Sequence, residues 1–545
     1  MPLLLLLLFI FCLVFLSPIK ETFEYNPDEG MNAAKASLFL KGFPLYKQIW
    51  SDQPPIFTLI LANWFKLFGL SVYFGRILVV LFSGLLLWAL FQTVRNDWGG
   101  MGALCASVFL VFSAGFIRLS SSLMIGLPAL SLGMSSIYLI ILYKKHNSLG
   151  LLALSGLCMA LSLQTKFFTA ILILPALSIF LQQPNPPEKQ KSSSGFIPGF
   201  IWLSILSCAY LAVVLIFFYP ELHLFRAQLF QPHLNKLSLP RNDFSIINLL
   251  LLQDYNVLVL ALTGTLACAK QKDWRFLPPF IWLSLAIIVL AKYRPLWDHH
   301  YLLISIPLCW LAGISISVFL RGLPFSGWFT RKNFPGLAQI LISFLTILGI
   351  ISCIANLALK SKVAWAEFIP VQKNQGNEMV NTLLKFKNKT RWIITDEPIF
   401  AFYADIPVPP EIAVATIKRR FSEGLSQKYF EDIFQKYEPE QVLLGRFQDY
   451  PLGVKSYLKN RYSQFSQIEI YQKPLLPDLC RVMIWEPLGK FLLGSIKFTS
   501  NKWLYHKIWH SFRLPVFPVI KLPPGKNTNK ITLTLFIRND ILKDF

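Results

Sequence analysis

The chain has 545 residues, of which 54% are hydrophobic and only 15% charged, and its formal net charge is +23. Soluble proteins carry about 25% charged residues, so this composition excludes an ordinary soluble domain and predicts a membrane protein. The basic residues are spread over short loops and the C-terminal end, which favours topology signals, contact with membrane lipids and a phosphate-bearing substrate over nucleic acid.

Apolar stretches long enough to form transmembrane helices, about 17 to 25 residues each, recur from the N-terminus to residue 358. The first lacks a basic start and a small-residue cleavage site, so a retained anchor is expected rather than a signal peptide. The sequence predicts about eleven spans, at 2–19, 77–93, 101–117, 124–143, 148–164, 167–182, 196–218, 246–269, 276–291, 300–320 and 335–358.

The orientation follows from the loops between these spans. With the N-terminus in the cytoplasm, every inner loop carries Lys or Arg, as the positive-inside rule requires. An odd number of spans then places the chain after residue 358 outside a cell membrane. The inner-loop cations are Arg95, Lys144, Lys145, Lys189, Lys191, Lys270, Lys272, Arg275, Arg321, Arg331 and Lys332.

The first outer loop, residues 20–76, carries the strongest chemical signal. Asn26 and Pro27 predict a helix start, and Asp28 and Glu29 fall in its first turn. Acidic residues there are explained by the helix dipole alone. However, the following amphipathic stretch, Met31–Leu40, is expected to lie along the membrane interface, which would put both carboxylates beside a lipid headgroup.

Basic residues at the outer ends of the predicted spans oppose the positive-inside trend and could bind a lipid phosphate. Each one singly is also explained by a side chain that snorkels to the headgroups. The adjacent His pair, next to Asp298, leaves a divalent metal as an alternative, although neighbouring residues on a helix point in different directions. The set is Arg76, Arg118, Lys166, Arg226, Lys292, Arg294, His299 and His300.

The C-terminal part reads as a small domain followed by a tail. Arg391–Asp396 and Gln441–Gly445 predict short buried strands, and Gln427–Lys436 has helical spacing. The expected organisation is a transmembrane domain at 1–358, an extracytoplasmic α/β domain at 359–486 and a basic irregular tail at 487–545.

Several motifs together resemble the C-type polytopic membrane glycosyltransferases (GT-C), in the branch of the bacterial protein-O-mannosyltransferases and aminoarabinose transferases. They are the Asp-Glu pair after the first span, Asp52-Gln53-Pro54-Pro55, Gln164-Thr165-Lys166, KYRPLWDHHYLL, TDEPIFAFYADIPVPPEI and VLLGRF.

This resemblance implies an all-α polytopic membrane domain followed by the small α/β domain. It also implies sugar transfer from a polyprenyl-phosphate donor to an extracytoplasmic acceptor. Asp28 would be the catalytic base, with Glu29 as its acidic neighbour and Asp52 before the Pro pair. The residues expected to bind the donor phosphate are Lys166, Arg118, Lys292, Arg294, Arg226, His299 and His300.

Two positions depart from the pattern of these relatives. Relatives often have Lys directly before the Pro pair, where this chain has Gln53, and many have an acidic residue where this chain has Gly126. These departures keep a non-catalytic relative that binds a partner as an alternative. A transporter or flippase is a separate alternative. The sugar, hexose or pentose, and the acceptor, whether lipid, polysaccharide or protein, also stay open.

Overall fold

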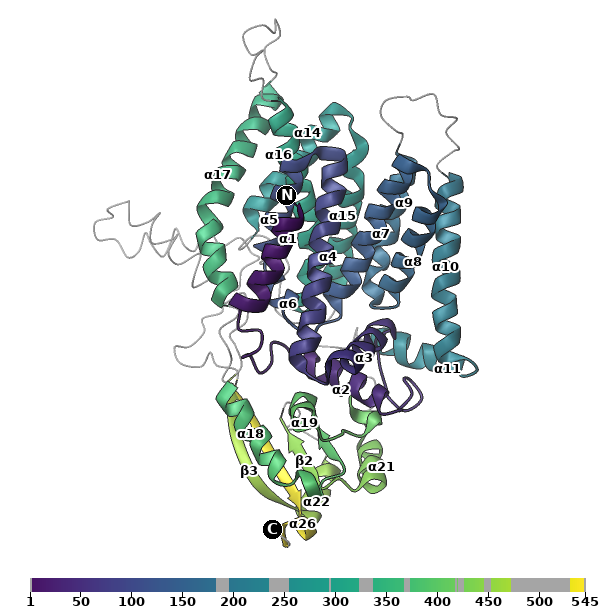
Figure 1. The fold of residues 1–545 in the computed structure, drawn as a ribbon, viewed down its shortest axis with the longest axis vertical. Coiled ribbons are helices and arrows are strands. Elements are labelled where there is room, and N and C mark those ends of the chain that lie inside the picture. The colour runs from purple at the N-terminus through teal and green to yellow at the C-terminus, as the bar shows by residue number, and fades with distance from the viewer. Residues whose placement is uncertain are drawn as a thin grey trace, which may run out of the picture.

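The computed structural model describes residues 2–182, 196–234, 254–293, 296–322, 337–366, 373–416, 419, 426–445, 452–471 and 530–543. Figure 1 shows a helical bundle and, beyond one end of it, a small α/β domain. Two helices of the first loop, α2 (Asp28–Leu40) and α3 (Ile56–Phe68), lie between the two parts.

The bundle contains a helix in each predicted span. Its elements are α1 (Pro2–Phe11), η1 (Cys12–Leu16), α4 (Val72–Trp98), α5 (Gly100–Val111), α6 (Phe116–Ser120), α7 (Gly126–His146), α8 (Leu149–Leu163), η2 (Phe167–Leu172), α9 (Ile173–Leu181), α10 (Phe196–Phe218), α14 (Tyr255–Gln271), η5 (Trp274–Phe276), α15 (Leu277–Lys292), η6 (Asp298–Tyr301), α16 (Leu302–Gly322) and α17 (Leu337–Ala366). Short helices follow α10, namely α11 (Leu222–Leu224), η3 (Phe225–Phe230) and α12 (Gln231–Leu234).

Within the described ranges, six helical segments are long and apolar enough to cross a membrane by length and composition. Five shorter apolar helices accompany them, and one of these is α3, which lies within the loop predicted at 20–76. The protein is therefore a multi-pass membrane protein. The predicted span at 246–269 is described only from residue 254 onwards, where it forms α14.

Burial separates the helices at the centre of the bundle from those at its edge. In the segment that contains α16, 89% of the most apolar stretch is buried inside the protein, compared with 17% in α10 and 11% in α17. Figure 1 shows α10 and α17 at opposite edges. A helix that is apolar all round and exposed needs an apolar solvent, so these two faces are suited to lipid.

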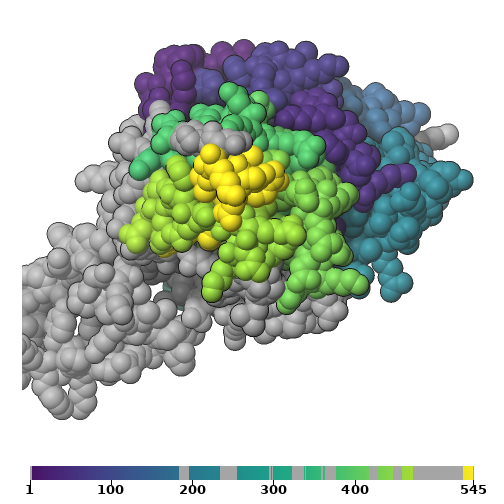
Figure 2. All heavy atoms as spheres, turned by 90° about the horizontal axis from the view of Figure 1, so that it is seen from below, coloured from purple at the N-terminus to yellow at the C-terminus, as the bar shows by residue number. Residues whose placement is uncertain are grey.

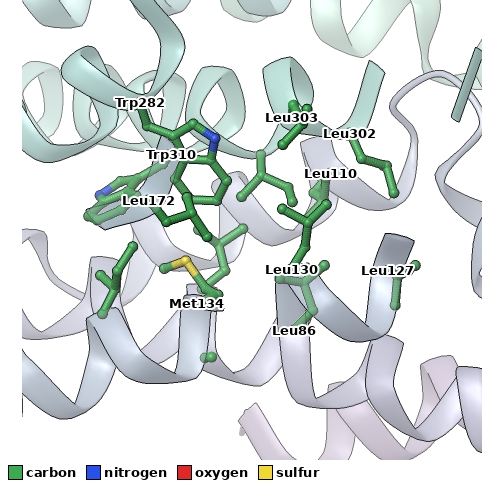
Figure 3. Packing of buried hydrophobic residues seen from close by; sticks show 14 of the residues in the cluster. Leu86, Leu110, Leu127, Leu130, Met134, Leu172, Trp282, Leu302, Leu303 and Trp310 are labelled. Carbon is green, nitrogen blue, oxygen red and sulfur yellow. The ribbon is translucent and has the colours of Figure 1, made fainter. Parts of the chain in front are cut away.

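The centre of the bundle is packed tightly against α16. A Cβ on Gly102 would lie 2.6 Å from the Gly313 carbonyl oxygen, so α5 and α16 approach each other through glycines, as membrane helices often do. Figure 3 shows Trp282, Trp310 and Leu172 gathered in this core.

The α/β domain has a four-stranded sheet with strand order β1-β2-β4-β3. Its elements are α18 (Lys373–Lys385), η7 (Lys387–Lys389), β1 (Ile393–Thr395), α19 (Pro398–Ala404), η8 (Pro410–Ile412), α21 (Gln427–Tyr437), β2 (Gln441–Leu444), α22 (Leu452–Arg461), β3 (Tyr462–Tyr471), β4 (Lys530–Arg538) and α26 (Asn539–Lys543). The predicted strands and the predicted helix at 427–436 are therefore present as β1, β2 and α21.

The expected tail at 487–545 is wrong for its last part. Strand β4 lies in the interior of the sheet, antiparallel to both β2 and β3, with Val442 opposite Phe536. Its alternating residues Leu533, Leu535 and Ile537 are buried, which is the pattern of a strand with one face on a core. The domain therefore extends to the C-terminal residues, whose yellow atoms lie against the green atoms of the domain in Figure 2.

Candidate functional site

Helix α2 begins where the sequence predicts it. The Asn26 side chain accepts a hydrogen bond from the Asp28 N–H at 3.0 Å, and Pro27 precedes the first helical residue. Most of α2 is buried, and it packs against α3 and α19. A Cβ on Gly30 would lie 2.5 Å from the Ile399 nitrogen, so only glycine permits this approach.

Glu29 forms a buried ion pair with Arg76 at the start of α4. Arg76 Nε lies 3.0 Å from Glu29 Oε1 and Nη2 lies 2.8 Å from Oε2, and both side chains are at most 1% exposed. The guanidinium also donates to the backbone carbonyls of Ile19, Thr22 and Phe23. Arg76 therefore has its donors occupied by the protein, and it joins α4 to the chain before α2.

The Glu29 carboxylate is saturated as well. It accepts the backbone N–H groups of Tyr25 and Leu123, each at 2.7 Å. Because burial and four hydrogen bonds leave no place for a substrate, the predicted catalytic neighbour is placed as a structural residue. It fixes the start of α2 and ties the 121–125 connection to it, and Asn32 adds a bond to the Leu123 carbonyl at 2.9 Å.

Asp28, one residue earlier, has a different environment. It is half-buried, and in the described part of the chain no hydrogen bond reaches its carboxylate. Lys35 lies seven residues further along α2, which is two turns and therefore the same face. The negative charges of Asp28 and Asp52 both act on the Lys35 ammonium.

Asp52 is the second carboxylate of this site. It is 3% exposed, and Lys35 beside it is 2% exposed. Burial lowers the pKa of Lys35, against the opposing effect of the two carboxylates. The Asp52 charge also acts on Tyr46. Burial, and to a smaller extent the Asp52 charge, raises the pKa of Tyr46 well above its usual value.

Hydrogen bonds from distant segments hold the stretch around Asp52. Gln228 on η3 accepts the Ser51 N–H at 3.1 Å and donates to the Tyr46 carbonyl at 2.6 Å. The Ile56 N–H donates to the Gln164 carbonyl at 3.1 Å. The Pro-Pro segment is therefore fixed beside the Gln164-Thr165-Lys166 turn, far away in sequence.

Lys166 completes this arrangement. Its ammonium lies 4.7 Å from the Phe168 ring centroid, and a Cβ on Gly126 would lie 3.7 Å from Nζ. Gly126 follows closely after Leu123, which is bonded to Glu29. The connection at 123–126 therefore contacts both α2 and Lys166. Gln164, two residues before Lys166, in turn contacts Ile56 next to the Asp52 segment.

The α/β domain contributes Arg419 to the same region. Its guanidinium is 3% exposed, lies 4.4 Å from the Trp50 ring centroid and donates to the Tyr429 hydroxyl at 2.9 Å. Burial lowers the pKa of Arg419, and Asp52 is among the groups that oppose this shift. The sequence analysis missed Arg419, because nothing local connects it to residues 50–52.

The sequence analysis also missed Lys35. The signal was present in its spacing of seven residues from Asp28 on a predicted helix. Lys35 lies within a loop helix, away from the ends of the predicted spans where the other cations occur.

The other predicted cations are dispersed. Arg118 is half-buried on α6, whereas Arg226 on η3 and Lys292 at the end of α15 are exposed. Arg294 lies outside the described residues.

His299 and His300 lie on η6, with ring centroids 4.4 Å apart. Tyr301 of the same turn donates to Asp254 at 2.8 Å, and Asp254 is also paired with Lys360 at 2.8 Å. This buried network fixes η6 to α14 and α17. Among the described residues, no group of three or more His, Cys, Asp or Glu side chains could hold a metal ion.

A cavity of about 310 Å³ opens between α2 and α19. Its α2 wall is formed by Ala34, Ser37, Leu38 and Lys41. The spacing of these residues puts them on a different face of α2 from Asp28 and Lys35, so the cavity is separate from the carboxylate site.

Comparison with known proteins supports the resemblance to membrane glycosyltransferases. Residues 52–218 match the model of the family described as dolichyl-phosphate-mannose-protein mannosyltransferase. No curated protein matches the chain. The matched segment includes Asp52, Gly126 and Lys166, and it begins after Asp28.

Solved structures match over most of the chain. ArnT from Cupriavidus metallidurans bound to undecaprenyl phosphate is 12% identical, with a TM-score of 0.56 and coverage of 85% of this chain and 95% of ArnT. The fold is that of the C-type glycosyltransferases. The archaeal oligosaccharyltransferase AglB from Archaeoglobus fulgidus, in complex with an inhibitory peptide and a dolichol-phosphate, is 11% identical, with a TM-score of 0.53 and coverage of 98% and 88%.

The resemblance inferred from the motifs is therefore confirmed. Helix α2, which carries Asp28 and Lys35, lies between the bundle and the α/β domain.

Proposed function

We propose that this protein is a membrane glycosyltransferase that moves a sugar from a polyprenyl-phosphate donor to a hydroxyl or amine of an acceptor. One observation carries the proposal. The carboxylate of Asp28 lies at the start of a rigidly held helix, half-buried and without a hydrogen bond from the described residues, on the same helix face as a buried cation.

In the reaction, Asp28 acts as general base. The acceptor's oxygen or nitrogen loses its proton to the Asp28 carboxylate and forms a bond to the anomeric carbon. The bond from that carbon to the lipid phosphate breaks, and its electron pair stays on the phosphate oxygen. A positioned base of this kind contributes about 10²- to 10⁴-fold to the rate.

The leaving phosphate requires cations and no proton donor. Lys166, which lies next to the segment that holds Asp52, is suited to stabilise the charge on the departing oxygen. Arg118 on α6 and Lys292 on α15 would add positive charge that favours the departing phosphate. Asp52 and Arg419 would hold the Pro-Pro segment against the α/β domain.

The site would face the outside of a cell membrane. With the N-terminus in the cytoplasm, the basic inner loops satisfy the positive-inside rule, and the α/β domain with α2 and α3 lies at the opposite end of the bundle. The acceptor would therefore be an extracytoplasmic lipid, polysaccharide or protein.

The test is the variant Asp28→Asn, which keeps the size of the side chain and removes the base. Glycolipids and glycoproteins from cells that carry the wild-type gene, the variant or a deletion are compared by mass spectrometry. The product that depends on the gene should disappear in Asp28→Asn, with normal amounts of the protein in the membrane. Asp405→Asn is the matched control, because Asp405 is 62% exposed on the α/β domain, and it should retain the product. Unchanged product in the Asp28 variant would reject the proposal.

A further inference from the structure

Lys35 is a buried cation that the mechanism above does not use. It is 2% exposed. In the part of the chain that the structure describes, its ammonium makes no hydrogen bond and no ion pair. An ammonium removed from water without a partner costs several kcal/mol in effective terms, so such a group is normally paired or absent.

Two carboxylates act on the Lys35 ammonium and favour its charged form. Asp28 lies on the same face of α2, and Asp52 faces it from the segment before α3. Both carboxylates act on the ammonium from beyond ion-pair distance, so their charge favours the cation while its three N–H donors stay available. Lys35 is thus linked by charge both to the proposed base and to the segment that precedes the Pro pair.

The chain lacks a cation at the neighbouring position. Gln53 stands where relatives often carry Lys, and its backbone carbonyl accepts the Tyr46 hydroxyl at 2.9 Å. Gln53 directly follows Asp52, whose charge reaches Lys35. A positive charge is therefore present beside the Pro-Pro segment, supplied by α2 instead of by residue 53.

We propose that Lys35 binds the phosphate group of the lipid donor and takes the place of the lysine absent at position 53. This inference rests on the proposed function for the class of donor. An anionic oxygen would give the buried ammonium the partner that the protein does not provide, and such charge-assisted bonds are among the stronger ones.

The experiment measures binding, independently of sugar transfer. The full chain in detergent is titrated with undecaprenyl phosphate, with undecaprenol and with inorganic phosphate, and binding is followed by native mass spectrometry. Lys35→Met removes the charge and keeps an unbranched side chain. It should weaken binding of undecaprenyl phosphate about 10- to 100-fold and leave the weak binding of undecaprenol unchanged.

The matched control is Lys41→Met on the same helix. Lys41 is partly exposed and lies 3.7 Å from Asp405, so its variant should bind undecaprenyl phosphate as the wild type does. The double variant Lys35→Met with Gln53→Lys should recover most of the lost affinity, because it returns the cation to the position that relatives use. Lys35→Arg keeps the charge and should keep measurable binding, which guards against a folding defect in Lys35→Met.

The outcomes separate the two proposals. Equal binding of undecaprenyl phosphate by Lys35→Met and the wild type would overturn the role of Lys35 alone. A wild-type protein that binds undecaprenyl phosphate no better than undecaprenol would overturn both the donor class and this inference. Loss of inorganic phosphate binding in Lys35→Met, with unchanged binding of undecaprenyl phosphate, would assign Lys35 to free phosphate and reject the lipid.

Discussion

Two buried cations, Arg76 on α4 and Lys35 on α2, have different surroundings. Arg76 is held by Glu29 and three backbone carbonyls, so its charge is compensated by the protein. Lys35 is equally buried, yet its ammonium makes no hydrogen bond and no ion pair with the described residues. The difference teaches that burial alone does not identify a functional charge. The compensated cation supports the fold, and the uncompensated one is suited to a ligand.

The largest expected effect concerns Arg76. Arg76→Met leaves the Glu29 carboxylate buried without its charged partner, and breaking one side of a buried pair costs about 3–5 kcal/mol. Thermal unfolding in detergent should show this loss. The double variant Arg76→Met with Glu29→Gln removes the stranded charge and should recover part of it. A single variant as stable as the wild type would contradict a structural role for the pair.

The opposite result is expected for the stability of Lys35→Met without lipid. Replacing an uncompensated buried ammonium by an apolar side chain should raise the free energy of unfolding by about 1 kcal/mol near neutral pH. The lowered pKa of Lys35 determines whether the free energy of unfolding rises or falls with pH. The folded protein binds fewer protons than the unfolded chain between the lowered pKa and the usual value.

In that window the wild type should therefore gain stability as the pH rises, and Lys35→Met should lack this gain. The measurement is thermal unfolding as a function of pH, with Lys41→Met as the reference. Destabilisation of Lys35→Met as large as that of Arg76→Met would remove the contrast between the two cations.

The smallest effect is expected at Gly126. An aspartate there would reach the Lys166 ammonium, since a Cβ at this position lies 3.7 Å from Nζ. The new carboxylate would compete with a phosphate and should weaken binding of undecaprenyl phosphate about three- to tenfold.

Gly100→Asp is the control for Gly126→Asp. Gly100 is also the first residue of a helix, α5, and nothing lies within 4 Å of its Cβ position. This variant adds the same charge to a helix start without reaching Lys166, and it should not change binding. Equal weakening in both variants would mean that Lys166 does not contribute to the phosphate site.

The helical part of the fold was largely readable from the sequence. Long apolar runs must form helices in a membrane, because every backbone polar group needs a partner inside the segment. The strands at 393–395 and 441–444 were recognised for a related reason, since short runs of buried apolar residues between turns are typical of strands. Strand β4 was missed, because the residues before it are basic and rich in turn formers, and its partners lie about 60 and 90 residues earlier.

The sequence by itself determined that the protein is polytopic and that Asp28 begins a helix after the first span, because both follow from local composition and local hydrogen bonding. Only the tertiary structure decided which charges meet. Glu29 and Asp28 are neighbours in the chain, yet Glu29 turns to Arg76 while Asp28 shares a helix face with Lys35. Such a division depends on helix packing between the bundle and the α/β domain, and no local pattern encodes the partners of a buried side chain.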